Sequence, residues 1–322
     1  MNPSQTQPQP QTAEPQRAEP QRAASQPQPV IVRPLARVIP SQPTSDGAGV
    51  RLRRSIGAHP GARVDPFLML DEFSSEDAAD YIAGFPAHPH RGFETVTYML
   101  DGHMRHEDHL GNRGHLTSGS VQWMTAGRGI IHSEMPEQES GRMRGFQLWV
   151  NLPARLKMQP PWYRDIAPAE LPVVALPAGG SIRVIAGEID MAGVRHTGPI
   201  AGPRFADSTD PQVWDLILPA GGSFSHGLPA GHQGFIYLYE GEARVGEDPG
   251  SRVLPAHAAG VLGDGNAVRI TAGLQGLRAL LIAGRPLREP VAQYGPFVMN
   301  TQDELRQALA DLHAGRLALP AD

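Results

Sequence analysis

The sequence contains no cysteine. Disulfide scaffolds, thiolate zinc sites, iron–sulfur clusters and cysteine nucleophiles are therefore excluded, and any bound metal must use histidine, carboxylate or water as ligands. Long apolar runs are also missing: none approaches the ~20 residues of a membrane-spanning helix, and the N-terminus lacks the apolar centre of a signal peptide. We therefore expect a cytoplasmic protein that makes no membrane contact.

An excess of basic residues is lacking as well, because 28 Lys and Arg stand against 33 Asp and Glu, a formal net charge of −5. This balance argues against a protein that binds nucleic acid directly, which needs a basic face. Helical periodicity is scarce, whereas 36 glycines and 32 prolines are present. Such a composition favours many short strands joined by turns.

The length of 322 residues suggests two domains, and a monomer is expected. Residues 1–29 are rich in proline and glutamine, so we expect a disordered tail with too little apolar surface to fold. We expect an N-terminal metal-binding barrel at residues 30–165 and a metal-free barrel at 166–300. Residues 301–322 should form a C-terminal helix and tail, because Thr301 and Glu304 make a capping box.

Strand signals recur at regular spacing through both halves. Residues 65–73 fit a buried strand that turns at Asp71, and residues 92–102 are rich in β-branched and aromatic side chains. The pair Asp101 and Gly102 is typical of a β-hairpin turn. The pattern at residues 98–102 returns at 237–241, which favours two barrels of one kind. The sequence therefore predicts an all-β sandwich or barrel architecture.

Histidines are concentrated in one part of the chain: seven of the thirteen fall between residues 88 and 132. His88 and His90 are separated by one residue, as are His132 and Glu134. In a strand, residues i and i+2 point to the same face, so each pair presents two metal ligands side by side. Two such strands facing each other across a barrel would enclose one ion with three nitrogens and one oxygen. Two octahedral positions would stay open, as a catalytic site requires.

Three long segments, in this order, resemble the pirin family of the cupin superfamily. They are residues 88–98 (HPHRGFETVTY), residues 122–135 (QWMTAGRGIIHSEM) and residues 294–301 (YGPFVMNT). The resemblance implies two tandem cupin barrels, which are double-stranded β-helices or jelly rolls, with one mononuclear metal in the first. It places the ligands on His88, His90, His132 and Glu134.

The resemblance also separates Glu94 from the ligands. This residue occupies the ligand position of cupins in general, but in pirins the glutamate of the second motif serves instead. We therefore expect Glu94 beside the ion. His103, His106 and His109 are expected to be surface residues or to support the ligands, with alternate side chains reaching the pocket rim. Arg91 and Arg128 are candidates for orienting ligands. Trp123, Met124 and Phe146 either pack in the core, which we favour, or line the pocket.

Three hypotheses for function follow. The first is a quercetin 2,3-dioxygenase-like oxidoreductase, a quercetinase, which takes dioxygen and a small aromatic substrate. Glu134 would be its catalytic base, taking the proton of the flavonol 3-hydroxyl. The second is a non-catalytic regulator whose metal redox state controls the binding of a protein partner. The third is a structural or storage-like bicupin, which the open coordination positions disfavour. Iron is the expected metal, and Mn, Co, Ni, Cu and Zn are compatible with these ligands.

Overall fold

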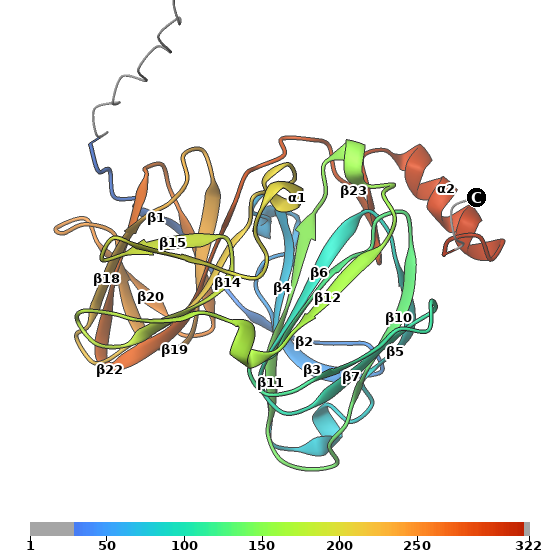
Figure 1. Ribbon diagram of the computed structural model, residues 1–322, viewed down its shortest axis with the longest axis horizontal. Helices are drawn as coiled ribbons and strands as arrows, with labels where there is room; N and C mark the ends of the chain where they lie inside the picture. Colours follow the sequence, from blue (N-terminus) through green and yellow to red (C-terminus); the bar gives the residue numbers. More distant parts are fainter. Residues whose placement is uncertain (1–28, 319–322) are drawn as a thin grey trace, which may run out of the picture.

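The protein consists of two β-rich lobes side by side, as seen in a computed structural model that describes residues 29–318 (Figure 1). The N-terminal lobe contains two sheets. The larger has seven strands, in the spatial order β12 (Trp162–Ile166), β9 (Val121–Thr125), β6 (Phe93–Asp101), β11 (Met143–Asn151), β4 (Phe67–Ser75), β3 (Val50–Arg54) and β2 (Gln42–Asp46). The smaller has four: β5 (Phe85–His90), β10 (Ile130–Pro136), β7 (Met104–Asp108) and β8 (Arg113–Leu116).

The C-terminal lobe is built on one nine-stranded antiparallel sheet. Its main path is β1 (Leu35–Pro40), β21 (Ala258–Leu262), β19 (Gln233–Val245), β22 (Ala267–Gly284), β17 (Gln212–Leu218), β14 (Ser181–Ala186) and β13 (Val173–Ala175). Two further strands branch from it: β18 (Ser223–Gly227) pairs with β22, and β20 (Arg252–Pro255) pairs with β19.

The remaining elements are short. Two hairpins are made by β15 (Glu188–Met191) with β16 (Val194–Thr197) and by β23 (Ala292–Tyr294) with β24 (Phe297–Met299). The α-helices are α1 (Pro203–Ala206) and α2 (Gln302–His313), and single 3₁₀ turns are η1 (Pro60–Ala62), η2 (Ala78–Asp80), η3 (Ala154–Leu156) and η4 (Pro168–Glu170). Among the described residues, no helix is long and apolar enough to cross a membrane.

The expected all-β class, with two barrels and a short C-terminal helix, is confirmed. The helix begins where the capping box predicts: the Thr301 hydroxyl accepts the N–H of Glu304 at 3.2 Å, and the Glu304 carboxylate accepts the N–H of Thr301 at 2.8 Å. Leu305 is buried, and Leu309 and Leu312 pack in the same cluster. Packing therefore accounts for this apolar stripe.

Two local predictions are wrong. The strand expected to turn at Asp71 continues to Ser75, because Arg54 on the neighbouring strand β3 holds Asp71 with two hydrogen bonds of 2.7 Å. The turn at Asp101 and Gly102 exists, with Gly102 at φ +100°, but it does not close a hairpin. The strands on either side, β6 and β7, belong to different sheets, so the turn carries the chain from one face of the barrel to the other.

The expected domain boundaries remain a prediction. Two segments pack against the lobe that lies on the other side of these boundaries. Strand β1 lies early in the chain but pairs with β21 in the second lobe. After β22 the chain returns to the first lobe, where the N–H of Arg91 donates to Pro296 and the N–H of Val298 donates to Arg91. The tail prediction for residues 1–29 falls almost wholly outside the described residues.

One apolar cluster joins the two lobes. It contains Trp123 and Phe146 of the first lobe together with Tyr237 of the second. The rings of Phe67 and Phe235 meet edge to face with centroids 5.5 Å apart. Each buried aromatic side chain of this kind contributes about 1.5–3 kcal/mol of transfer free energy. This shared core holds the first lobe, and the histidines it carries, against the second.

Candidate metal centre

His88, His90 and His132 come together at one point. His88 and His90 lie on β5, and His132 lies on the adjacent strand β10, directly opposite His88 in the antiparallel register. Their candidate ligand atoms all lie within 4.8 Å of one another. The predicted clustering is therefore seen, but the predicted placement is wrong in one respect. The two strands are hydrogen-bonded neighbours in one sheet and do not face each other across the barrel.

The distances between the rings suit a shared ion. The Nε2 atoms of His88 and His90 are 3.0 Å apart. Two nitrogens bound at about 2.1 Å to one ion, at a right angle, would be separated by about 3.0 Å. The rings of His88 and His132 have centroids 4.4 Å apart, and those of His90 and His132 are 4.9 Å apart. All three imidazoles can therefore point to one position.

Hydrogen bonds prepare the histidines as neutral ligands. His88 donates from Nδ1 to the carbonyl of Pro86 at 2.8 Å, which leaves the lone pair on Nε2. The Nδ1 of His132 is 2.9 Å from the Nε2 of His106, while the buried Nε2 of His132 has no partner among the described residues. An unpaired buried nitrogen is costly unless it receives a ligand. The unpaired Nε2 of His132 therefore fits a site that receives a metal ion.

Burial also favours the neutral form of the histidine side chains at this site. It lowers the pKa of His90 and of His132 well below the usual histidine value, with repulsion from the neighbouring imidazoles as the second cause. Burial also lowers the pKa of His106, although the carboxylate of Glu134 partly opposes this shift. Both shifts favour the neutral imidazole of His90 and of His132, which is the form that binds metal.

Glu134 lies near this group but is not part of it. Its buried carboxylate accepts a hydrogen bond from Thr97 Oγ1 at 2.8 Å and one from Gln147 Nε2 at 3.1 Å. Thr97 and Gln147 come from β6 and β11 of the larger sheet, so Glu134 bridges the barrel interior. Neither Thr97 nor Gln147 was singled out by the sequence analysis. Coordination by Glu134 and its role as a catalytic base remain predictions.

Glu94 is separate from the histidines, in a second buried position. Its Oε1 accepts the hydroxyl of Thr125 at 2.7 Å, and its side chain does not belong to the metal-binding group. Burial raises the pKa of Glu94 to about 7, while Thr125 and the more distant Arg204 oppose the rise. That Glu94 lies beside the ion and is not a ligand remains a prediction.

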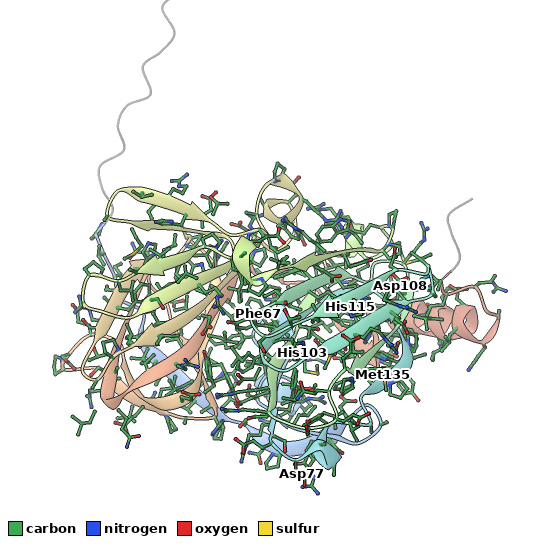
Figure 2. The ribbon with its side chains drawn as sticks, turned by 60° about the horizontal axis from the view of Figure 1, so that its bottom comes forward. Phe67, Asp77, His103, Asp108, His115 and Met135 are labelled. Carbon is green, nitrogen blue, oxygen red and sulfur yellow. The ribbon has the colours of Figure 1, made fainter. Side chains whose placement is uncertain are left out.

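The other candidates divide between core and surface. Trp123, Met124 and Phe146 are buried in apolar clusters, as we favoured. His106 is fully buried behind His132, whereas His103 and His115 are exposed; Figure 2 labels both. Arg91 donates to the carbonyl of Arg128 and pairs with Asp311 of α2 at 2.9 Å, so it fixes the C-terminal helix to the barrel.

A cavity of about 840 Å³ opens at the histidines. Its lining includes His88, His90 and Glu134, the aromatic side chains of Phe85 and Trp149, and two residues from outside the barrel, Gln293 and Pro296. Cavities of this size hold small organic molecules. The aromatic walls were not predicted from the sequence. Residues 294–301 were singled out as a family-like segment, but that Pro296 lines the cavity was not predicted.

Comparison with known proteins identifies the family. The Pirin family profile matches residues 49–150, and the profile of the Pirin C-terminal cupin domain matches residues 213–318. The chain belongs to the pirin family. The bicupin fold that the sequence resemblance implied is therefore shown.

The relatives of this chain are named either as quercetin 2,3-dioxygenases or as pirins. A Pseudomonas aeruginosa protein provisionally named a quercetin 2,3-dioxygenase is 52% identical over 278 residues, 86% of this chain and 95% of the relative. Human pirin is 41% identical over 273 residues, 84% of this chain and 89% of the relative. The crystal structure of a quercetin 2,3-dioxygenase from Acinetobacter baumannii has a TM-score of 0.79 at 31% identity, covering 89% of this chain and 99% of its own.

A more distant pirin structure contains a metal. The bacterial pirin of Escherichia coli, solved in complex with nickel(II), has a TM-score of 0.57 at 19% identity and covers 78% of this chain and 98% of its own. At this identity the likeness concerns the fold alone.

Proposed function

We propose that this pirin is a mononuclear-metal dioxygenase that acts on flavonols such as quercetin. The observation that carries the proposal is the three-histidine group. His88 and His90 line a cavity of about 840 Å³, and His132 beside them has an unpaired buried nitrogen. A metal site that only stabilised the fold would have no need of an adjoining cavity large enough for a substrate.

The proposed ligands are His88, His90, His132 and Glu134. Three imidazoles and a carboxylate suit iron first, with Mn, Co, Ni, Cu and Zn compatible. The ion would supply Lewis-acid polarisation of a substrate oxygen and, for a redox metal, access to dioxygen chemistry. To become a ligand, the Glu134 carboxylate would have to exchange at least one of its hydrogen bonds to Thr97 and Gln147.

Glu134 is the proposed base. It lines the cavity together with His88 and His90, so a hydroxyl of a bound substrate can approach it. Thr97 and Gln147 donate to its two oxygens and hold the carboxylate in place. Proton transfer from the flavonol 3-hydroxyl to a carboxylate oxygen would leave the substrate anionic for reaction with dioxygen.

His106 orients His132 in this proposal. With its lone pair on Nε2 for the metal, His132 carries its proton on Nδ1 and donates it to His106 Nε2, 2.9 Å away. His106 reaches this position because β7 pairs with β10 in a register that sets His106 opposite Glu134. It acts through His132 and does not contact the cavity.

Oxygen consumption tests the function. We expect metal-loaded wild-type protein to consume dioxygen in step with the loss of quercetin absorbance, and the His88→Ala variant to do neither. Loading with iron, manganese, nickel, copper, cobalt and zinc in turn distinguishes inactivity caused by the wrong metal from inactivity caused by an incorrectly assigned reaction. Inactivity of all six metal-loaded forms on a flavonol panel would contradict the proposal. Retention of a protein partner that depends on the metal redox state would then favour the regulator hypothesis.

A further inference from the structure

A buried arginine outside the candidate metal centre lacks an ionic partner within residues 29–318. The side chain of Arg33 is 3% exposed. Its Nη1 donates to the carbonyl of His232 at 2.6 Å, and its buried Nε has no hydrogen-bond partner among the described residues. Within that part of the chain no carboxylate oxygen comes within 4.0 Å of its guanidinium. Burial lowers the pKa of Arg33, and the more distant Asp264 only partly offsets this.

A guanidinium removed from water without a counter-charge is unfavourable. Proteins ordinarily pair such a charge with a carboxylate or reserve it for a ligand, because an unpaired buried ion is destabilising. Arg33 has one hydrogen bond to a carbonyl, which is a neutral acceptor. The buried Nε–H therefore calls for an acceptor from outside the described chain, and an anion is the acceptor that also balances the charge.

Space for such an anion exists next to Arg33. A cavity of about 370 Å³ lies there, between the second barrel and Val64 of the first lobe. Arg288 lines the same cavity and is exposed, and like Arg33 it makes no ion pair within the described residues. Asp65 holds the backbone of Arg288 by accepting its N–H at 2.7 Å, with φ at +56°. One carboxylate, that of Asp264, also lines the cavity.

We propose that this cavity binds a small, multiply charged oxyanion, either a phosphate ester or a polycarboxylate, between Arg33 and Arg288. Two guanidinium groups offer paired N–H donors that match either kind of oxyanion. None of the residues that line this cavity lines the one at the histidines. The anion site is thus separate from the proposed dioxygenase reaction and does not rest on it.

Calorimetric titration of the full chain in low-salt, phosphate-free buffer tests the site. The probes are inorganic phosphate, glycerol 2-phosphate and tricarballylate, which separate phosphates from carboxylates. We expect 1:1 binding of at least one probe. Arg33→Met and Arg288→Gln should each weaken it at least tenfold, because each removes charge-assisted hydrogen bonds to the anion. Arg53→Gln removes an exposed arginine that does not line this cavity and should leave binding unchanged.

Melting temperature gives a second readout. Because the unpaired charge is unfavourable, Arg33→Met should melt at or above the wild-type temperature in anion-free buffer and should lose the rise that the bound probe gives wild type. A purely structural role for Arg33 predicts a lower melting temperature in anion-free buffer. Failure of all three probes to bind wild type, or equal loss of binding in Arg53→Gln, would overturn the proposal. If Arg33→Met does not fold, the binding measured with Arg288→Gln tests the proposal: undiminished binding would contradict it.

Discussion

The Nε2 of His106 lies 2.9 Å from the Nδ1 of His132, on the side of the imidazole opposite the proposed metal. Both residues are buried, and they come from adjacent strands, β7 and β10. A histidine held in this way has one available lone pair and one ring orientation. The arrangement gives the first prediction.

Replacement of His106 by leucine should weaken metal binding by about 10–100-fold, the usual effect of removing a group that supports a metal ligand. His106→Gln keeps an acceptor near His132 Nδ1 and should restore part of the affinity. Competition with a chelator of known affinity measures both. His115→Leu is the matched control, because His115 is exposed and pairs with Glu137. Wild-type affinity and an unchanged Co²⁺ spectrum in His106→Leu would rule out the orienting role.

Replacement of Glu134 by glutamine should separate its proposed role as a metal ligand from its proposed role as the catalytic base. The change removes a negative charge and the proton acceptor but retains the shape of the side chain and an oxygen for Thr97 to donate to. Turnover of quercetin should fall by at least the ~10²-fold typical of general-base loss, even in preparations that hold a full complement of metal. A metal-loaded Glu134→Gln protein with wild-type turnover would refute the base role.

Glu94 should make stability depend on pH. Its pKa is raised to about 7 by burial, from 4.5 in an unfolded chain, so as pH rises the unfolded state loses its proton first. The stabilising contribution is complete below about pH 4.5 and is lost as the pH rises to about 7. Glu94→Gln should remove this dependence and be more stable above pH 7, by roughly 3 kcal/mol at most. Urea denaturation from pH 5 to 8 measures the difference, and parallel curves for the two proteins would contradict the assignment.

Lys157 should hold the C-terminal segment against the first barrel. Its buried Nζ donates to the carbonyls of Gly92 and Val298 at 2.8 and 3.0 Å, and to Asn151 Oδ1 at 2.6 Å. Lys157→Met leaves these acceptors buried without a donor and should lower the free energy of unfolding by about 3 kcal/mol. The exposed Arg155→Met should have little effect. Chemical denaturation compares them, and equal stability of the two variants would show that Lys157 is not needed.

The sequence was informative where chemistry depends on neighbours along the chain. The spacing of His88 to His90 predicts two imidazoles on one face of a strand, and the structure has them there. Which strands pair with each other could not be predicted from such local patterns. The same dipeptide, Asp101 and Gly102, suits a hairpin and a crossing between sheets, and only the long-range pairing of β6 with β11 and β7 with β10 decides between them.

Contacts made by distant residues could not be predicted. Thr97 and Gln147 hold Glu134 from two other strands. Thr97 lies within the family-like segment at 88–98 and Gln147 lies outside all three segments, but no local pattern marks either as a partner of Glu134. Pro296 lines the cavity after the chain has passed through the whole second lobe. Such contacts depend on how the lobes pack, which a local pattern does not encode.

Metal content tests the central claim most directly. Protein purified without chelator and measured by mass spectrometry should contain about one transition-metal ion per chain. The His88→Ala/His132→Ala double variant should contain almost none. His226→Ala should match wild type, because the ring nitrogens of His226 contact the backbone carbonyls of Gly227 and Asp190 in the second lobe. Equal metal content in wild type and the folded double variant would contradict the account.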